Sequence, residues 1–208
     1  SMTCGGADRS SSAAKLQAEL AVHVTRSVGR PGSSVLIFVS GMGEIVDLVD
    51  RFEKLNESAG YSSGGAGGAA ASGSALLSST SSTSLSGSGV FYKVVAIHSQ
   101  IPDEEQEEAF KVESDGRTVK VVVATNAAES SITLPDVDHV VCFGVMKQIE
   151  YNEATHRTLL SPLWISRASA IQRAGRTGRV RPGTVYRLYA RQLFEKHMEP
   201  FDGGEMKR

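Results

Sequence analysis

The chain has 208 residues, of which 40% are hydrophobic and two are cysteines, and its formal net charge is −1 at pH 7. This length suits one α/β domain. The composition excludes a disulfide-rich fold, a membrane-spanning helix and a domain that binds nucleic acid through bulk positive charge alone. The charge is nevertheless uneven, because residues 157–196 carry nine Lys and Arg against one acid. We therefore expect one face of the C-terminal half to meet an anion.

The first sixty residues predict two helices on either side of a buried strand. Apolar residues recur every four positions from Leu16 to Val28, which predicts a helix over 12–28. The continuous apolar run 35–39 is typical of a strand buried on both faces. A one-sided apolar pattern predicts a second helix over 44–55.

A low-complexity stretch interrupts this pattern at 58–89. Of its 32 residues, 28 are Gly, Ser, Ala or Thr, and none is charged. Such a segment buries too little apolar surface to offset the entropy of ordering it. We expect a long disordered insert. An insert that binds a partner is the alternative.

The remainder returns to short apolar strands and helical segments. Pro102, followed by a run of acids, predicts a helix start because carboxylates favour the positive end of the helix dipole. In chain order we predict a strand at 92–97, a helix at 103–112, strands at 119–124 and 139–143, a hairpin within 147–163, a strand at 184–189 and a helix at 192–198. This alternation predicts an α/β fold, a parallel sheet with helices on both faces, formed as a single domain around the long disordered insert.

Polar residues follow three of the predicted strands directly. Because ligands bind at the carboxyl ends of parallel strands, we expect these residues to lie along one edge of the domain. Their hydroxyls, amides and exposed backbone suit contacts to phosphate and sugar, although local helix capping is the alternative for Ser40 and Asn126. The residues are Ser40, Gly41, His98, Ser99, Thr125 and Asn126, and of these His98 is expected to be a packing residue.

The most informative segment is 172–179, which reads Gln-Arg-Ala-Gly-Arg-Thr-Gly-Arg after a helical run. Its spacing of three predicts that Arg173, Arg176 and Arg179 share one helical face. Guanidinium groups match phosphate oxygens bidentately, and glycines allow a ligand to approach closely. Three like charges on one face repel each other, so the pattern predicts a bound anion, with a nucleoside triphosphate as the first candidate. A solvated arginine face or a nucleic-acid patch is the alternative.

The order of residues in 172–179 resembles motif VI of superfamily 2 helicases, and the leading Gln resembles the DEAH-box branch. Three more segments resemble helicase motifs in the same order. Residues 35–41 resemble motif IV, residues 97–110 the motif that follows it, and residues 124–133 motif V. The resemblance extends over about residues 30–200.

This resemblance implies a RecA-like fold and, within it, the second of the two RecA-like domains of an ATP-dependent DEAH-box RNA helicase. The P-loop and acidic motifs, which the family keeps on its first RecA-like domain, do not occur in these 208 residues. We divide the chain into a tag and disordered N-terminus at 1–9, the domain at 10–200, and at 201–208 the start of a linker to a winged-helix domain.

The resemblance also implies the ligands and partners. These are ATP or another nucleoside triphosphate, with Mg²⁺ held mainly by the first RecA-like domain, and single-stranded RNA. The first RecA-like domain and the winged-helix domain of the same polypeptide would be further partners, and an activating protein is a candidate. We expect the protein to act inside the cell, in nucleus or cytoplasm, without a membrane. The chain alone would be inactive.

Individual roles follow from the matched motifs. Phe110 matches the aromatic residue that stacks on the nucleotide base, with a core phenylalanine as the alternative. Gly175 and Gly178 would keep the phosphate approach open or end the helix. The catalytic set is Gln172, which would order the γ-phosphate and the attacking water, and the arginine fingers Arg176 and Arg179. The RNA set is Ser40, Gly41, Ser99, Thr125 and Asn126.

Several neighbouring residues have other expectations. Arg173 is expected to pair with a carboxylate within the domain, and Glu129 to be a structural acid that pairs within the domain or with an arginine of 172–179. Pro135 stands where some members carry a ribose-binding Asp, with Asp136 next. Cys142, expected to be a buried thiol, stands where the family usually has Asp.

Two other functions stay open on the sequence alone. A catalytically inactive relative would use the domain as an RNA-binding or scaffolding module. A DNA helicase of the same superfamily would use the same motifs on a different nucleic acid.

Overall fold

The computed structural model describes residues 11–61, 89–98, 110–111, 116–126, 129, 134, 136–152, 156–179 and 181–201. The predicted tag at 1–9, the interior of the insert, Ser99, most of the predicted helix 103–112 and nearly all of 201–208 lie outside the described residues. Within the described residues, no helix is both long enough and apolar enough to cross a bilayer.

The centre of the domain is one five-stranded sheet in which every pairing is parallel. This confirms the predicted parallel α/β sheet, with each strand within two residues of its expected bounds. In spatial order the strands are β2 (Phe91–Ile97), β3 (Thr118–Ala124), β1 (Ser34–Phe38), β4 (His139–Cys142) and β7 (Thr184–Arg187).

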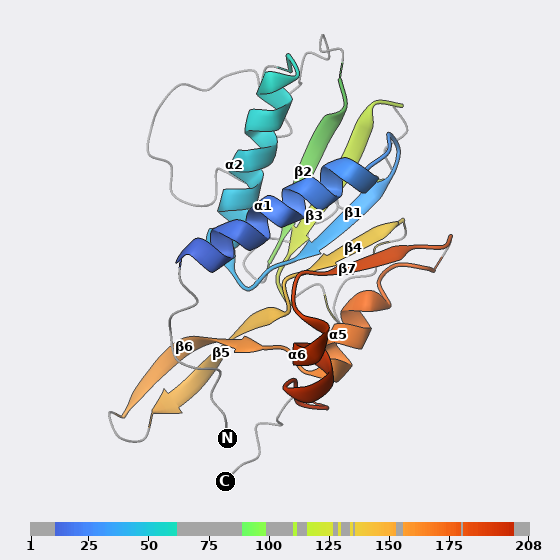
Figure 1. Ribbon diagram of the computed structural model, residues 1–208. Helices are drawn as coiled ribbons and strands as arrows, with labels where there is room; N and C mark the ends of the chain where they lie inside the picture. Colours follow the sequence, from blue (N-terminus) through green and yellow to red (C-terminus); the bar gives the residue numbers. More distant parts are fainter. Residues whose placement is uncertain are drawn as a thin grey trace.

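Helices cover both faces of this sheet (Figure 1). Helices α1 (Ser11–Val28) and α2 (Met42–Ser58) pack on one face, and α5 (Arg167–Ala174) and α6 (Arg191–Lys196) pack on the other.

The central strand β1 illustrates how the two faces divide the core. Val35 and Ile37 pack toward α1 and α2, and Leu36 and Phe38 pack toward α5 and α6. Its continuous apolar run is therefore explained by burial on both sides.

A two-stranded antiparallel hairpin extends from the sheet (Figure 1). It consists of β5 (Val145–Asn152) and β6 (Arg157–Trp164), which confirms the hairpin predicted within 147–163. The strand-to-hairpin corner is Gly144, whose φ is +77° and whose added Cβ would lie 2.4 Å from Cδ1 of Tyr189. Only glycine fits this corner, because a side chain would meet both an unfavourable backbone conformation and a packed ring.

The predicted boundary of the insert at residue 58 is wrong. Helix α2 continues to Ser58, and Tyr61 is only 1% exposed. The Tyr61 hydroxyl donates to the carbonyl of Gly89, and its ring centroid lies 5.2 Å from that of Phe91. Counting small residues missed this contact, because one aromatic side chain holds the two ends of the insert together.

Candidate functional site

Segment 172–179 does not form one continuous helix. Helix α5 begins after Ser166, whose Oγ accepts a hydrogen bond from the Ser169 amide at 3.0 Å, and it ends at Ala174. Gly178 has a φ of +79°, which no helical residue adopts. The expectation that three arginines share a helical face is therefore wrong. The glycines end the helix, and residues 175–179 form a separate segment that we call the arginine turn.

Arg173, the last arginine inside α5, is 0% exposed and belongs to the core. Its Nε donates to Oε2 of Glu129 at 2.9 Å, and its guanidinium carbon lies 5.0 Å from the ring centroid of Phe38. Its Nη1 lies 4.0 Å from Sγ of Cys142. These contacts confirm that Arg173 pairs within the domain and that Glu129 binds an arginine of this segment. They also confirm that Cys142 is buried, and this burial raises the pKa of its thiol.

Arg176 and Arg179 lie on the arginine turn, outside the core. Arg176 is half-buried, and its Nη2 donates to the main-chain carbonyl of Glu129. Arg179 is exposed, with Nε 3.4 Å from the carbonyl of Gly175. Burial, followed by the charge of Arg179, lowers the pKa of the Arg176 guanidinium, whereas Glu129 opposes this effect. Two guanidiniums that repel each other at the surface form a donor set suited to an anion.

Gln172 is exposed on the last turn of α5, directly before this turn. The structure therefore brings the three predicted catalytic residues into one short segment. The two glycines differ in conformation. Gly175 caps the helix at a φ of −68°, and a Cβ there would meet nothing closer than 3.4 Å. Gly178 requires glycine because of its positive φ.

The arginine turn is attached to the start of β4. Thr177 shares its hydroxyl hydrogen between the carbonyl oxygens of Val137 and Asp138, at 2.7 and 2.9 Å. Gly183 closes the contact, because an added Cβ would lie 1.8 Å from Oγ1 of Thr177. The turn therefore has a fixed position that the protein sets before any ligand binds.

Asp138 anchors the same region from the sheet side. Its Oδ2 accepts from the main-chain amide of Ser34 at 2.9 Å and from Nη2 of Arg181 at 2.7 Å. The carboxylate of Asp138, directly before β4, thus binds both the start of β1 and the segment after the arginine turn. Helix α5 starts near Gly144, after the end of β4, and leads back to the beginning of β4. The arginine turn accordingly lies at the amino-end edge of the sheet.

Phe110 is 39% exposed, which excludes the alternative of a core phenylalanine. The main-chain carbonyl of the next residue, Lys111, accepts from Nζ of Lys120 at 2.9 Å. Lys120 is the third residue of β3, and its Nζ also pairs with Oδ1 of Asp136 at 2.8 Å. Asp136 lies one residue before Val137, which contacts the arginine turn. Phe110 and the arginine turn are therefore tied to the same edge of the sheet.

The residues predicted to contact RNA lie at the opposite, carboxyl-end edge. Ser40, Thr125 and Asn126 follow β1 and β3, and His98 follows β2 and is buried, as expected for a packing residue. This confirms the shared edge for the described residues, whereas Ser99 lies outside them. The eight residues of α5 correspond to a separation of about 12 Å between this edge and the arginine turn.

Ser40 and Asn126 both make local hydrogen bonds, but in these bonds neither side chain accepts from a helix amide, as a cap would. The carboxylate of Glu44 accepts from the Ser40 hydroxyl at 2.5 Å, the Ser40 amide at 2.6 Å and the Gly41 amide at 3.2 Å. The Asn126 carbonyl accepts from the Glu129 amide at 2.9 Å. The Ser40 hydroxyl and the Gly41 amide are therefore both engaged with Glu44, and the Thr125 amide donates to the carbonyl of Ile97.

Lys147 is a residue that the sequence reasoning missed. It lies in β5, yet a Cβ added to Gly41 would sit 3.0 Å from its Nζ. This places an ammonium group beside the polar residues of the carboxyl-end edge. Its position in a hairpin strand carried no local signal, because the contact joins segments about one hundred positions apart.

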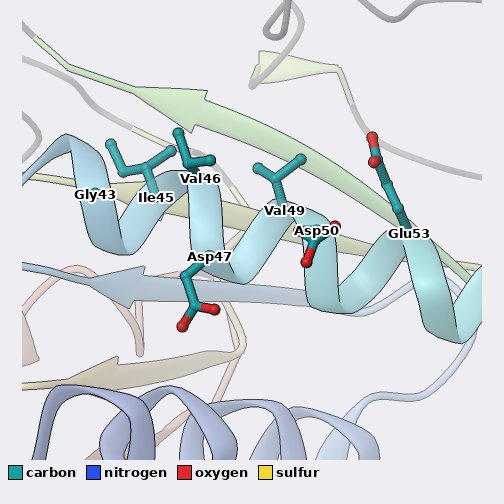
Figure 2. Close-up of a pocket in the computed structure, with 7 residues that line it drawn as sticks. All are labelled: Gly43, Ile45, Val46, Asp47, Val49, Asp50 and Glu53. Atoms are coloured by element: carbon teal, nitrogen blue, oxygen red, sulfur yellow. The ribbon is translucent and has the colours of Figure 1, made fainter. Parts of the chain in front are cut away.

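A groove of about 320 Å³ runs along the outer side of α2 and contains none of the predicted site residues. Figure 2 shows that its lining residues all lie on that one helix, and that they include the apolar Ile45, Val46 and Val49 and the acidic Asp47, Asp50 and Glu53. Burial, with the charges of Asp50 and Glu57, raises the pKa of Glu53. Such an acidic groove disfavours phosphate.

This chain is similar to known proteins in both sequence and fold. A protein family described as the helicase conserved C-terminal domain matches residues 72–181. ATP-dependent RNA helicase dhx29 of Xenopus laevis is 47% identical over 108 residues, 52% of this chain and 8% of that protein. DExH-box ATP-dependent RNA helicase DExH1 of Arabidopsis thaliana is 34% identical over 173 residues, 83% of this chain and 14% of that protein.

A solved structure with the same fold is that of the E. coli DExH-box NTPase HrpB. It has a TM-score of 0.65 and 24% sequence identity, and the match covers 91% of this chain and 19% of that one. The chain thus spans between about a twelfth and a fifth of the length of these relatives.

Proposed function

This chain belongs to the helicase conserved C-terminal domains of the DEAH/DExH-box RNA helicases, and from that premise we propose that it completes a nucleotide site shared with a second domain. It is the second RecA-like domain of an ATP-dependent RNA helicase. At its amino-end edge it supplies two guanidiniums to a triphosphate held mainly by the first RecA-like domain. At its carboxyl-end edge it forms one side of a path for single-stranded RNA.

One observation carries this proposal: Arg176 and Arg179 lie on one short turn that hydrogen bonds within the domain hold in place. Thr177 holds the turn to Val137 and Asp138, and the main chain of Glu129 holds Arg176. Donors that are already in place lose little reorganisation energy when negative charge develops in a transition state.

The donor set fits a triphosphate on chemical grounds. Each guanidinium offers a planar fork that matches two phosphate oxygens, and the repulsion between Arg176 and Arg179 decreases when an anion lies between them. Neither the backbone conformation of Gly175 nor its surroundings in the domain require glycine. We therefore assign to this glycine the role of leaving room for the phosphate groups to approach the turn. Arg173 takes no part, since its charge is used within the core.

Phe110 serves as the platform for the nucleotide base. Its exposed ring lies at the same edge as the arginine turn, and stacking on a ring does not discriminate strongly between bases. We therefore propose ATP, with other nucleoside triphosphates accepted. Asp136 makes no ribose contact, because Lys120 already binds its carboxylate at 2.8 Å. Mg²⁺ is assigned to the first RecA-like domain.

In this mechanism the arginine turn acts on the transferred phosphoryl group. Arg176 and Arg179 neutralise the charge that builds on its oxygens, an effect of about 10³–10⁵ in rate for arginine fingers of other nucleotide hydrolases. Gln172 orients the attacking water. Opening and closing of the cleft between the two domains then moves the RNA held by Ser40, Gly41, Thr125, Asn126 and Lys147. Ser99 belongs to the same RNA-binding set by its position in the sequence.

Phosphate release by the full-length protein, with and without single-stranded RNA, tests this proposal. Arg179→Ala should lower RNA-stimulated release at least about 10³-fold. The matched control is Arg191→Ala. Arg191 is an exposed arginine of α6 that pairs with Glu195, one turn further along the same helix. Normal turnover of Arg179→Ala would refute the finger role. A wild-type protein that binds RNA but releases no phosphate would favour the inactive, RNA-binding relative instead.

A further inference from the structure

Lys120 is a buried ammonium group in a strand that is otherwise apolar over most of its length. It is 1% exposed, and the residues on either side of it, Val119 and Val121, are fully buried. Its neighbours in register are Ser34 on β1 and Lys93 on β2. Burying a charge is costly even when it is paired, and an apolar side chain would serve a central strand at least as well. The strand alone therefore gives no reason for a lysine at this position.

The hydrogen bonds of Lys120 show where this residue acts. Nζ donates to the main-chain carbonyl of Lys111 at 2.9 Å and pairs with Oδ1 of Asp136 at 2.8 Å. Lys111 directly follows Phe110, the proposed base platform. Asp136 directly precedes Val137, whose carbonyl accepts from Thr177 of the arginine turn. One ammonium group thus lies between the two halves of the proposed nucleotide site.

We propose that Lys120 is a positioning residue that holds the Phe110 platform in register with the arginine turn. The inference rests on the proposed function, since it assigns the base to Phe110 and the phosphates to the turn. An exposed ring stacks well only if its backbone is held in place, because any motion of that backbone must be frozen when the base binds. Lys120 supplies this restraint from the core, and its other partner belongs to the segment that carries the turn.

This role predicts an effect on one part of the nucleotide only. Without the ammonium group the backbone next to Phe110 loses its hydrogen bond from Lys120, whereas the turn keeps its own bonds to Val137 and Asp138. Binding of the base should weaken and phosphate chemistry should not. Since base–aromatic stacking accounts for roughly a tenfold change in affinity or more, KM for ATP should rise about tenfold with kcat within about twofold.

The test uses the full-length helicase and the substitution Lys120→Met, which keeps the length of the side chain and removes the charge. KM and kcat for RNA-stimulated ATP hydrolysis are measured, together with the inhibition constant of inorganic tripolyphosphate, which has no base. We expect a higher KM for ATP and an unchanged tripolyphosphate constant. Lys54→Met, which removes an exposed lysine that pairs with Asp50 within α2, is the matched control.

A double-mutant cycle with Phe110→Ala identifies the route of the effect. If Lys120 acts through the platform, Lys120→Met should raise KM no further in the Phe110→Ala background. Additive effects, or equal losses of ATP and tripolyphosphate binding, would overturn the proposal. If Lys120→Met does not fold, Lys120→Gln, which shortens the side chain and removes the charge but keeps a polar group, is judged by the same readouts.

These outcomes separate the inference from the proposed function. Phe110→Ala without any effect on KM, or Arg179→Ala with normal turnover, would remove the base platform or the finger and so refute the proposed function. An effect of Phe110→Ala combined with wild-type behaviour of Lys120→Met would refute the positioning role alone.

Discussion

Replacing Glu129 with Gln would leave the guanidinium of Arg173 in the core without its carboxylate. Arg173 is 0% exposed and Glu129 is 12% exposed, and their Nε and Oε2 atoms lie 2.9 Å apart. Removing one partner of a buried ion pair typically costs about 3–5 kcal/mol. Gln keeps an oxygen acceptor, and the Phe38 ring remains beside the charge. We therefore expect a loss near the lower limit, about 3 kcal/mol in the free energy of unfolding.

The assay is urea unfolding followed by circular dichroism and by the fluorescence of Trp164, which is the only tryptophan of the chain. The matched control is Glu19→Gln, because Glu19 is exposed and its Oε1 lies 3.7 Å from Nη1 of Arg51. A pair of that kind contributes little, so the control should change stability by less than about 1 kcal/mol.

A double mutant shows whether the cost comes from the stranded charge. Glu129→Leu combined with Arg173→Met removes both charges, and should be less destabilised than Glu129→Leu alone. A Glu129→Gln protein within about 1 kcal/mol of the wild type would refute the reasoning. So would a double mutant whose loss equals the sum of the two single losses.

Three further predictions concern the same domain. Gly178→Ala should lower the free energy of unfolding in urea by about 1–2 kcal/mol, because the φ of Gly178 is +79°. Gly175→Ala should leave it nearly unchanged, because the φ of Gly175 is −68°. Equal losses in the two variants would contradict these backbone roles. Burial lowers the pKa of His139, so the unfolded chain takes up a proton first as the pH falls. The stability that is present above the unfolded pKa should therefore decrease as pH falls through that value, about 6.5. This slope should flatten in His139→Gln. Tyr61→Phe should lower the free energy of unfolding by about 1 kcal/mol, because it removes the hydroxyl hydrogen bond to Gly89. Tyr61→Ala should lower it by about 3–5 kcal/mol, because it also removes the packing of the ring against Phe91. Similar losses in the two variants would show that the ring does not hold the ends of the insert together.

The sheet was predictable because its strands are short, continuous apolar runs. Residues 118–124 and 34–38 are buried throughout, which is the pattern of strands covered by helices on both faces. Strand order and register were not predictable, since they depend on packing between distant segments. The start of the insert was predicted too early for a similar reason, because the contact that Tyr61 makes with Gly89 joins residues that are far apart in the sequence.

The arginines show the limit of spacing as evidence. Arg173, Arg176 and Arg179 stand three residues apart, yet only the first lies in the helix, where it is buried against Glu129. A period of three predicts a common face only as long as the helix continues. Glycines at 175 and 178 carried the signal for the end of the helix, and their helix-ending role had been an open alternative.

The division of the candidate sites between two edges could not be inferred from the motifs. Strand order alone places Ser40, Thr125 and Asn126 at the carboxyl-end edge, as expected. The location of Phe110 and the arginine turn at the other edge depends on side-chain bonds made by Lys120 and Thr177. Lys120 belongs to no pattern that local sequence could reveal. Thr177 lies within segment 172–179, but its bonding partners are set by the tertiary fold.

The most direct test of the central claim is a structure of the full-length protein with single-stranded RNA and a bound analogue of the phosphoryl-transfer state. We predict that the guanidiniums of Arg176 and Arg179 lie about 3 Å from oxygens of the terminal phosphate analogue. Both side chains directed into bulk water, with the analogue bound elsewhere, would contradict the account.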